Sequence, residues 1–117
     1  MWSVATTETF DDWFTDLDAV AKSEVIAKVE LLKILGPQLS RPHADVLKGS
    51  KHANMKELRF KADGGVWRVA YAFDPKREAI LLVAGDKSGV SEKRFYTQLI
   101  SKSDARYNEH LKNSKEK

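Results

Sequence analysis

Residues 55–96 decide the fold of this chain, and they read MKELRFKADGGVWRVAYAFDPKREAILLVAGDKSGVSEKRFY. The first run, 56–61, alternates apolar and polar side chains, as a half-buried strand does. Asp63-Gly64-Gly65 is a strong turn signal, so the next run, 66–73, is expected to pair with the first as an antiparallel hairpin. A third strand follows the turn at Asp74-Pro75, and the stretch ends in a helical pattern.

The second strand of this hairpin separates two kinds of side chain. The face expected to lie in the core carries Trp67, Val69, Tyr71 and Phe73. The other face carries Arg68 among the small neighbours Val66, Ala70 and Ala72. Small neighbours leave a hollow beside a fixed guanidinium, so Arg68 is a candidate anion site off the core. The alternative is an exposed arginine that pairs with Glu57 or Asp63.

The third strand and the final helix complete this half of the chain. Residues 80–83 are apolar at every position, which predicts a strand covered on both faces. The polar loop that follows would project Lys87 near the open end of the sheet. The helix from Ser91 has imperfectly spaced packing positions, namely Phe95, Leu99, Ala105 and Leu111. Tyr96 lies just inside it, and residues 112–117 are expected to be frayed.

The N-terminal third predicts a short strand followed by two helices. Residues 2–6 suit the strand, and Thr6 or Thr7 suits the N-cap of the first helix. The apolar stripe of that helix is Phe10, Trp13, Phe14 and Leu17. The second helix would start at Asp18 and stop at Gly36-Pro37. Its expected apolar face is Val20, Val25, Ile26, Val29, Leu32 and Leu35. The two helices would form a hairpin that covers one face of the sheet.

The positive charge of the chain is concentrated next to the first half of the sheet. Residues 41–68 hold seven Lys or Arg and three acidic residues, whereas the whole chain has a net charge of +3. A polyanion would be attracted there, although a solvated surface explains the same pattern. Residues 37–54 lack periodicity and are expected to be a long basic loop. The two histidines of this loop match no zinc-site spacing, so no metal is expected.

Length and composition indicate one domain over residues 1–117. The chain has no cysteine, which excludes disulfides and thiolate zinc sites and fits a reducing cytoplasm. No apolar run approaches the roughly 18 residues of a membrane span, and the N-terminus lacks the features of a signal peptide. A cytoplasmic protein without membrane contact is therefore expected.

These elements predict an α+β fold: a small antiparallel or mixed sheet, with an N-terminal helical hairpin and a C-terminal helix. In this layout the chain resembles the RelE/ParE superfamily of type II toxins, within its HigB or phage Gp49-like branch. The resemblance covers residues 2 to about 111. The runs that carry it are LKGSKHANMKELRF (47–60), VWRVAYAFDP (66–75), ILLVAGDKSG (80–89), RFY (94–96) and RYNEHL (106–111).

The resemblance implies a type II toxin that acts as an endoribonuclease and cuts messenger RNA in the A site of the 70S ribosome. It implies no metal and no cofactor. In that chemistry the 2′-hydroxyl of the RNA attacks the adjacent phosphate, so the protein must move protons and stabilise the extra charge on phosphorus. The resemblance also implies a HigA-like helix-turn-helix antitoxin as partner.

The family's site residues match four positions of this sequence. Arg68 would clamp the phosphate, and Lys87 would stabilise the transition state or donate a proton. Many relatives have an arginine where Lys87 stands, and a lysine cannot bind two oxygens in a fork. Tyr96 would act as a base or as a platform for base stacking, and Arg59 would bind the RNA backbone or assist catalysis. The side chains expected to bind RNA are Lys48, Lys51, His52, Lys56 and Lys61. His43 and His52 are rival acid–base candidates.

Two other functions fit the same resemblance. A ParE-like protein keeps the fold but inhibits DNA gyrase by binding it, and it needs no catalytic cluster. A phage-derived binding module would be without toxicity.

Overall fold

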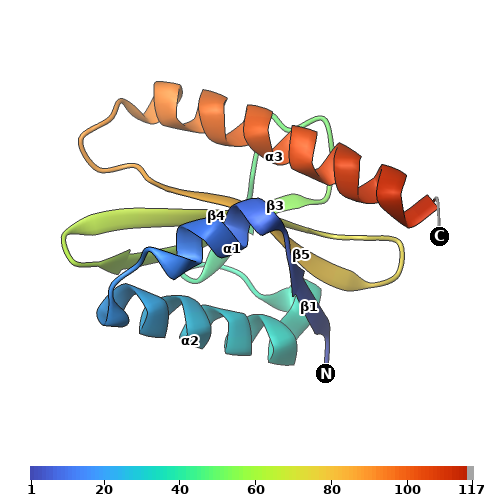
Figure 1. Cartoon of the computed structure of the whole chain (residues 1–117), viewed down its shortest axis with the longest axis horizontal. Helices are drawn as coiled ribbons and strands as arrows, with labels where there is room; N and C mark the ends of the chain where they lie inside the picture. The colour runs from blue at the N-terminus through green and yellow to red at the C-terminus, as the bar shows by residue number, and fades with distance from the viewer. Residues whose placement is uncertain (116–117) are drawn as a thin grey trace.

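A five-stranded sheet runs through the middle of the molecule, with helices on both of its faces (Figure 1). The computed structural model describes residues 1–115. Its strands are β1 (Ser3–Thr6), β2 (Ala44–Val46), β3 (Met55–Ala62), β4 (Gly65–Phe73) and β5 (Glu78–Asp86). Its helices are α1 (Glu8–Thr15), α2 (Ala19–Leu35) and α3 (Glu92–Lys115), with a short 3-10 helix at Gly36–Gln38.

The strand order is β1-β5-β4-β3-β2. β1 runs parallel to β5, and all other neighbours are antiparallel. The sheet is therefore mixed, and the α+β class expected from the sequence is confirmed. β4 is the middle strand, and one irregularity between Ala70 and Tyr71 shifts its register against β5.

Each face of the sheet has its own core. The core under α1 and α2 includes Phe10, Val25, Leu32, Leu58, Val69, Tyr71 and Leu81. The core under α3 includes Met55, Ala70, Ala72, Ile80, Leu82, Phe95, Leu99 and Tyr107. The expected inward face of β4 is thus confirmed, but the expectation that its other face lies off the core is wrong. Ala70 and Ala72 are fully buried there, because their small side chains let α3 pack closely against the strand.

Side-chain caps set the helix starts. The Thr7 hydroxyl accepts a hydrogen bond from the Phe10 backbone N–H (3.1 Å) and donates one to the Leu82 carbonyl (2.6 Å). The same threonine therefore caps α1 and ties it to β5. Asp18 caps α2 by accepting from the Ala21 N–H at 2.8 Å. Of the stripe expected on the first helix, Phe10 is buried and Trp13 and Phe14 are partly buried on α1, whereas Leu17, also partly buried, lies after the end of that helix.

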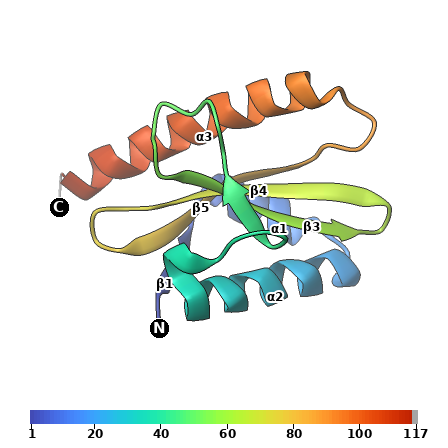
Figure 2. The ribbon, with the colours of Figure 1, turned by 180° about the vertical axis from the view of Figure 1, so that it is seen from behind.

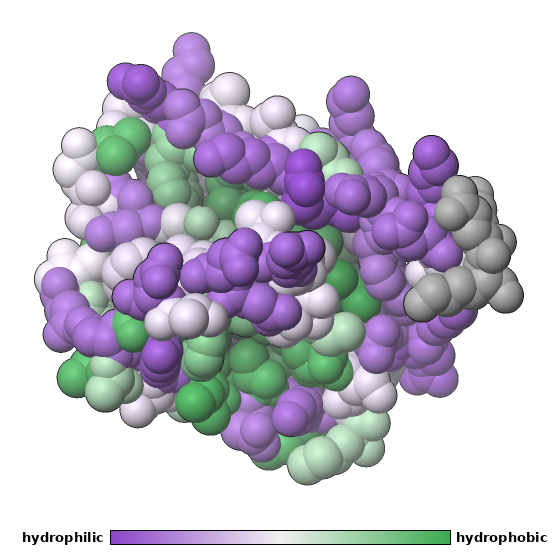
Figure 3. Space-filling model, in the orientation of Figure 1, coloured by the Kyte–Doolittle hydropathy of each residue, from purple (hydrophilic) through white to green (hydrophobic). Residues whose placement is uncertain are grey.

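The expected apolar face of α2 is only partly right. Val25 and Leu32 are buried and Val29 packs against the core, but three expected members are exposed: Val20, Ile26 and Leu35. Ala21 takes the inward position instead. Ile26 lines a shallow, mainly apolar groove of about 340 Å³ between α1, α2 and β1. Figure 3 shows apolar surface in this region, bordered by polar side chains of both helices.

The connection expected as a long loop, 37–54, holds more structure than its sequence indicated. It contains most of the 3-10 helix and the strand β2, which pairs with β3 at the edge of the sheet. The rest of the segment rises toward α3 (Figure 2) and is fastened there. Asp104 of α3 accepts hydrogen bonds from the Ser50 hydroxyl and from the Lys51 backbone N–H.

The final helix also departs from expectation. Phe95 and Leu99 are buried and Leu111 packs against the core, but Ala105 is exposed and Tyr107 is buried in its place. Residues 112–115, expected to be frayed, belong to α3. The other two residues of that expected tail, 116 and 117, lie outside the described part of the chain. Within residues 1–115, no helix has the length and apolar character to cross a membrane.

The two buried tyrosines give a matched test of the packing. Tyr71 is fully buried, burial raises its pKa well above the ordinary value, and its hydroxyl has no hydrogen-bond partner among the described residues. Because an unpaired buried hydroxyl is costly, Tyr71→Phe should raise the free energy of unfolding by about 1 kcal/mol. Chemical denaturation followed by fluorescence measures the change.

Tyr107→Phe is the control for this prediction. The Tyr107 hydroxyl donates to the Phe73 carbonyl (3.1 Å) and accepts from the Asn54 side chain (3.2 Å). Its removal should lower the free energy of unfolding by about 1 kcal/mol. A loss of stability in Tyr71→Phe would contradict the unpaired state of its hydroxyl.

Candidate functional site

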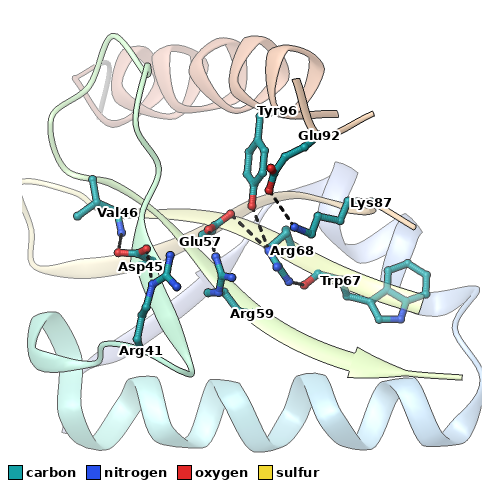
Figure 4. Close-up of polar contacts among 10 residues, drawn as sticks. All are labelled: Arg41, Asp45, Val46, Glu57, Arg59, Trp67, Arg68, Lys87, Glu92 and Tyr96. Carbon is teal, nitrogen blue, oxygen red and sulfur yellow. Dashed lines mark hydrogen bonds and ion pairs between the residues drawn. The ribbon is translucent and has the colours of Figure 1, made fainter. Parts of the chain in front are cut away.

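Three basic side chains lie on the face of the sheet that α3 covers (Figure 4). Arg59 of β3 stands directly opposite Arg68 of β4 in the antiparallel register. Lys87 follows the last residue of β5, and its ammonium lies 5.9 Å from the centre of the Tyr96 ring. We call these three residues the cation row. Cations held side by side at one face of a sheet form a suitable surface for a chain of phosphates.

A buried carboxylate lies beside the two arginines. Glu57 of β3 is 3% exposed, and its Oε2 accepts a hydrogen bond from Arg59 Nη1 at 2.7 Å. Its Oε1 lies 3.8 Å from Arg68 Nε. Strand alternation explains this arrangement, because Glu57 and Arg59 are two residues apart and share one face of β3.

Two hydrogen bonds hold the Arg68 side chain. Its Nε donates to the Tyr96 hydroxyl (3.1 Å), and its Nη1 donates to the carbonyl of Trp67 (2.9 Å). The side chain is only 6% exposed, and Tyr96 of α3 occupies the space that its small neighbours leave on this face of the sheet. The hollow that Arg68 does line opens on the side of Arg59 and Lys61. Arg68 is therefore oriented before any ligand arrives.

Tyr96 keeps its proton at neutral pH. Burial raises the pKa of its phenol, the hydrogen bond from Arg68 opposes the rise, and the nearby Glu57 carboxylate adds to it. The net direction is upward from an ordinary value near 10. At neutral pH the hydroxyl is thus available as a proton donor, and a phenolate base would require strongly alkaline conditions.

The loop after β5 positions Lys87. Its backbone N–H bonds the Val66 carbonyl at 2.8 Å, and Asp86 accepts from the Val66 N–H and from Ser88. Burial pushes the pKa of Asp86 upward, but these hydrogen bonds outweigh it and hold the pKa below its usual value. Lys87 Nζ donates to Glu92 at 3.1 Å, at the exposed start of α3. Because Glu92 is exposed, a phosphate can displace it with little loss.

Two hollows meet at Arg59. One, of about 300 Å³, is lined by Glu57, Arg59, Glu92 and Tyr96 together with Arg41, Asp45, Val46, Leu47 and Lys48. The other, of about 260 Å³, is lined by Arg41, Pro42, Arg59, Phe60, Lys61 and Arg68. At their shared edge, Arg41 donates to Asp45 at 2.8 Å, and this bond holds the pKa of Asp45 below its usual value. A chain of phosphates could pass over Arg59 between the two hollows.

The structure gathers some of the expected RNA-binding residues and separates others. Lys48 and Lys61 line the hollows, and Lys51 is exposed on the loop fastened to α3. Lys56 lies on the opposite face, where its Nζ bonds the Pro37 carbonyl at 3.0 Å. His52 bonds Asn108 at 2.8 Å and is not among the residues that line either hollow.

The rival acid–base histidine His43 is also occupied elsewhere. Its Nδ1 lies 2.8 Å from Lys28 Nζ, on the side of α2. Both imidazole rings thus have their partners elsewhere, and His43 meets the cation row through its backbone carbonyl, which accepts a hydrogen bond from the Arg59 N–H at 2.9 Å. Within residues 1–115, no group of three or more His, Asp or Glu side chains could hold a metal ion.

Sequence reasoning missed two acidic members of the site. Glu57 was considered only as a surface partner for Arg68, and Glu92 was not considered. The alternation of β3 could have placed Glu57, since it puts that carboxylate on the same face as Arg59. No local signal indicates that Glu92 reaches Lys87, because that contact depends on the path of the loop after β5.

Comparisons with known proteins agree with this fold. Residues 12–108 match the family described as Phage derived protein Gp49-like. The chain is 44% identical over 94 residues to the Mycobacterium tuberculosis protein named as toxin HigB3, covering 80% of each chain. It is 40% identical over 108 residues to the one named as toxin HigB2, covering 92% of this chain and 53% of HigB2. The chain thus spans about half the length of HigB2.

A solved structure extends the likeness beyond sequence. A mutant of the Escherichia coli toxin RelE in the free state superposes with a TM-score of 0.64 at 11% identity. The match covers 90% of this chain and 96% of that one, so the two share a fold. The Gp49-like branch expected from the sequence is confirmed: the chain belongs to the phage-derived Gp49-like family, is similar in sequence to the two proteins named as HigB toxins, and shares its fold with RelE.

Proposed function

We propose that this chain is the toxin of a type II toxin–antitoxin pair and that it cleaves messenger RNA on the ribosome. The observation that supports this most is the cation row Arg59, Arg68 and Lys87, with the Tyr96 hydroxyl bonded to Arg68. Binding without catalysis, as in a gyrase inhibitor, does not require a proton-bearing phenol fixed on a buried arginine. The two HigB relatives and the structural neighbour RelE are all named as toxins, which supports the proposal that this chain is a toxin.

The proposed chemistry uses the RNA as its own nucleophile. The 2′-hydroxyl gives up its proton to solvent water as its oxygen attacks phosphorus, the bond from phosphorus to the 5′-oxygen breaks, and the products are a 2′,3′-cyclic phosphate and a 5′-hydroxyl. Extra negative charge develops on the phosphate oxygens, where Arg59 and Arg68 would stabilise it. The leaving 5′-oxygen needs a proton, and the donors at the site are Lys87 and Tyr96. Because its pKa is raised, the Tyr96 phenol is protonated at neutral pH and can donate its proton to the 5′-oxygen.

The partners in this proposal follow from the same surface. The exposed lysines Lys48 and Lys51 would extend the cation row along the RNA backbone. A helix-turn-helix antitoxin of the HigA type would bind and neutralise the protein. The chain itself needs no metal or cofactor for this chemistry, since arginine and lysine supply the positive charge.

Removal of Lys87 tests the catalytic proposal with little risk to the fold, because its side chain is partly exposed. In cells that express the chain, 5′ ends of a reporter messenger RNA are mapped by primer extension. Wild type should produce discrete new ends within the reading frame. Lys87→Ala should reduce cleavage about 10²–10³-fold, as expected when one transition-state contact is lost.

Lys33→Ala is the matched control, since it removes a lysine on α2 far from the site. It should cleave like wild type. Growth arrest of cells with uncut messenger RNA would contradict cleavage and favour inhibition of DNA gyrase. Absence of growth arrest would favour a binding module without toxicity.

The loop lysines allow a separate test of RNA binding. For single-stranded RNA, each phosphate contact contributes about 0.7 to the slope of log K against log salt concentration. Loss of Lys48 and Lys51 together, each to Ala, should weaken binding and reduce the slope by about 1.4. Fluorescence anisotropy with a labelled oligonucleotide measures both quantities. The control variant loses Lys22 and Lys33 of α2 and the same total charge. An equal effect in both variants would show that RNA binding depends on the net charge of the protein and not on contacts made by Lys48 and Lys51.

A further inference from the structure

We infer that Glu57 is a positioning residue: it holds Arg59 and Arg68 in the orientation in which both guanidiniums can meet one stretch of RNA backbone. This inference rests on the proposed function for its substrate. The arrangement of the two arginines can be tested without any substrate.

The first step is the repulsion between the two arginines. Arg59 and Arg68 are direct cross-strand partners on the same face of the sheet. Like charges directly opposite each other destabilise a sheet, and two long side chains in this position tend to turn away from each other. Burial makes the conflict larger, because Arg68 is almost completely shielded from water.

The second step is the identity of the counterion. Among the described residues, Glu57 is the one acidic side chain within ion-pair distance of both arginines, at 2.7 Å from Arg59 and 3.8 Å from Arg68. Glu57 comes from the same strand as Arg59, so its backbone position is fixed relative to that arginine. One carboxylate thus offsets the repulsion of a pair of cations and leaves a net positive charge for a ligand.

The third step concerns the free oxygen of Glu57. Its Oε1 is buried and has no hydrogen-bond partner among residues 1–115. A buried oxygen without a hydrogen-bond donor is costly, so a donor that moves toward it would gain free energy. Arg68 Nε now donates to the Tyr96 hydroxyl, with Oε1 next to it at 3.8 Å. When a substrate takes the Tyr96 hydroxyl, Oε1 can accept from Arg68 instead, so Arg68 keeps its orientation during the reaction.

The test uses Glu57→Gln, which preserves shape and removes the charge. Nitrogen-15 NMR of the Arg Nε–H groups reports the order of Arg59 and Arg68 in the free protein. Both signals should broaden or disappear in the variant. In ribosome-dependent cleavage, kcat should fall about 100-fold while KM stays nearly unchanged, because the cations remain present but are misplaced. Glu30→Gln, which removes an exposed carboxylate on α2, should change none of these quantities.

Each other outcome has a definite meaning. Unchanged arginine signals in Glu57→Gln would overturn the inference. Tighter RNA binding with unchanged kcat would also overturn the inference, because it would show that Glu57 weakens RNA binding and does not position the arginines. If wild type cleaves no RNA, the proposed function fails, and the arginine signals alone decide the role of Glu57.

A second variant keeps the inference testable if Glu57→Gln does not fold. The double variant Glu57→Gln with Arg59→Gln removes the repulsion together with its counterion. It should fold and be more stable than Glu57→Gln alone. A double variant that is no more stable than the single one would contradict the role of Glu57 as counterion.

Discussion

The close packing of α3 on the small residues of β4 determines the candidate site. Ala70 and Ala72 have no exposed surface, and Phe95, Leu99 and Tyr107 of α3 share their core. A larger side chain at either alanine would lift the helix from the sheet. Tyr96 follows Phe95 directly, so its hydroxyl reaches Arg68 only because the helix lies this close. The hydrogen bond between Tyr96 and Arg68 therefore depends on the small size of these two alanine side chains.

Much of the fold could be predicted from local patterns. The alternation in β3 and β4, the glycine turn between them and the apolar run of β5 all correspond to observed strands. The three-residue strand β2 could not be predicted, because so short a segment has no period and forms only through its pairing with β3. The burial of Arg68 was also beyond local reasoning, since it depends on a helix that begins 24 residues later in the chain.

The site was predictable to the extent that strand alternation determines it. Arg59 and Arg68 lie on the same face, as the pattern of both strands requires. The same alternation places Lys56 beside Leu58, so its position away from the site agrees with the sequence even though it was expected to bind RNA. Tyr96 was found only through the family resemblance, and its bond to Arg68 depends on tertiary packing. The sequence offered Glu57 only as an alternative surface partner for Arg68, and it gave no sign that Glu92 pairs with Lys87.

The parallel pairing of β1 with β5 has a consequence for the order of folding. Residues 3–6 lie at one end of the chain, and their partners are residues 78–81. During synthesis the first strand has no partner until most of the chain has been made. Contacts this distant along the chain close late and slow the folding of a small domain. The N-terminal strand is thus the first part of the sheet to be translated and among the last to find its place.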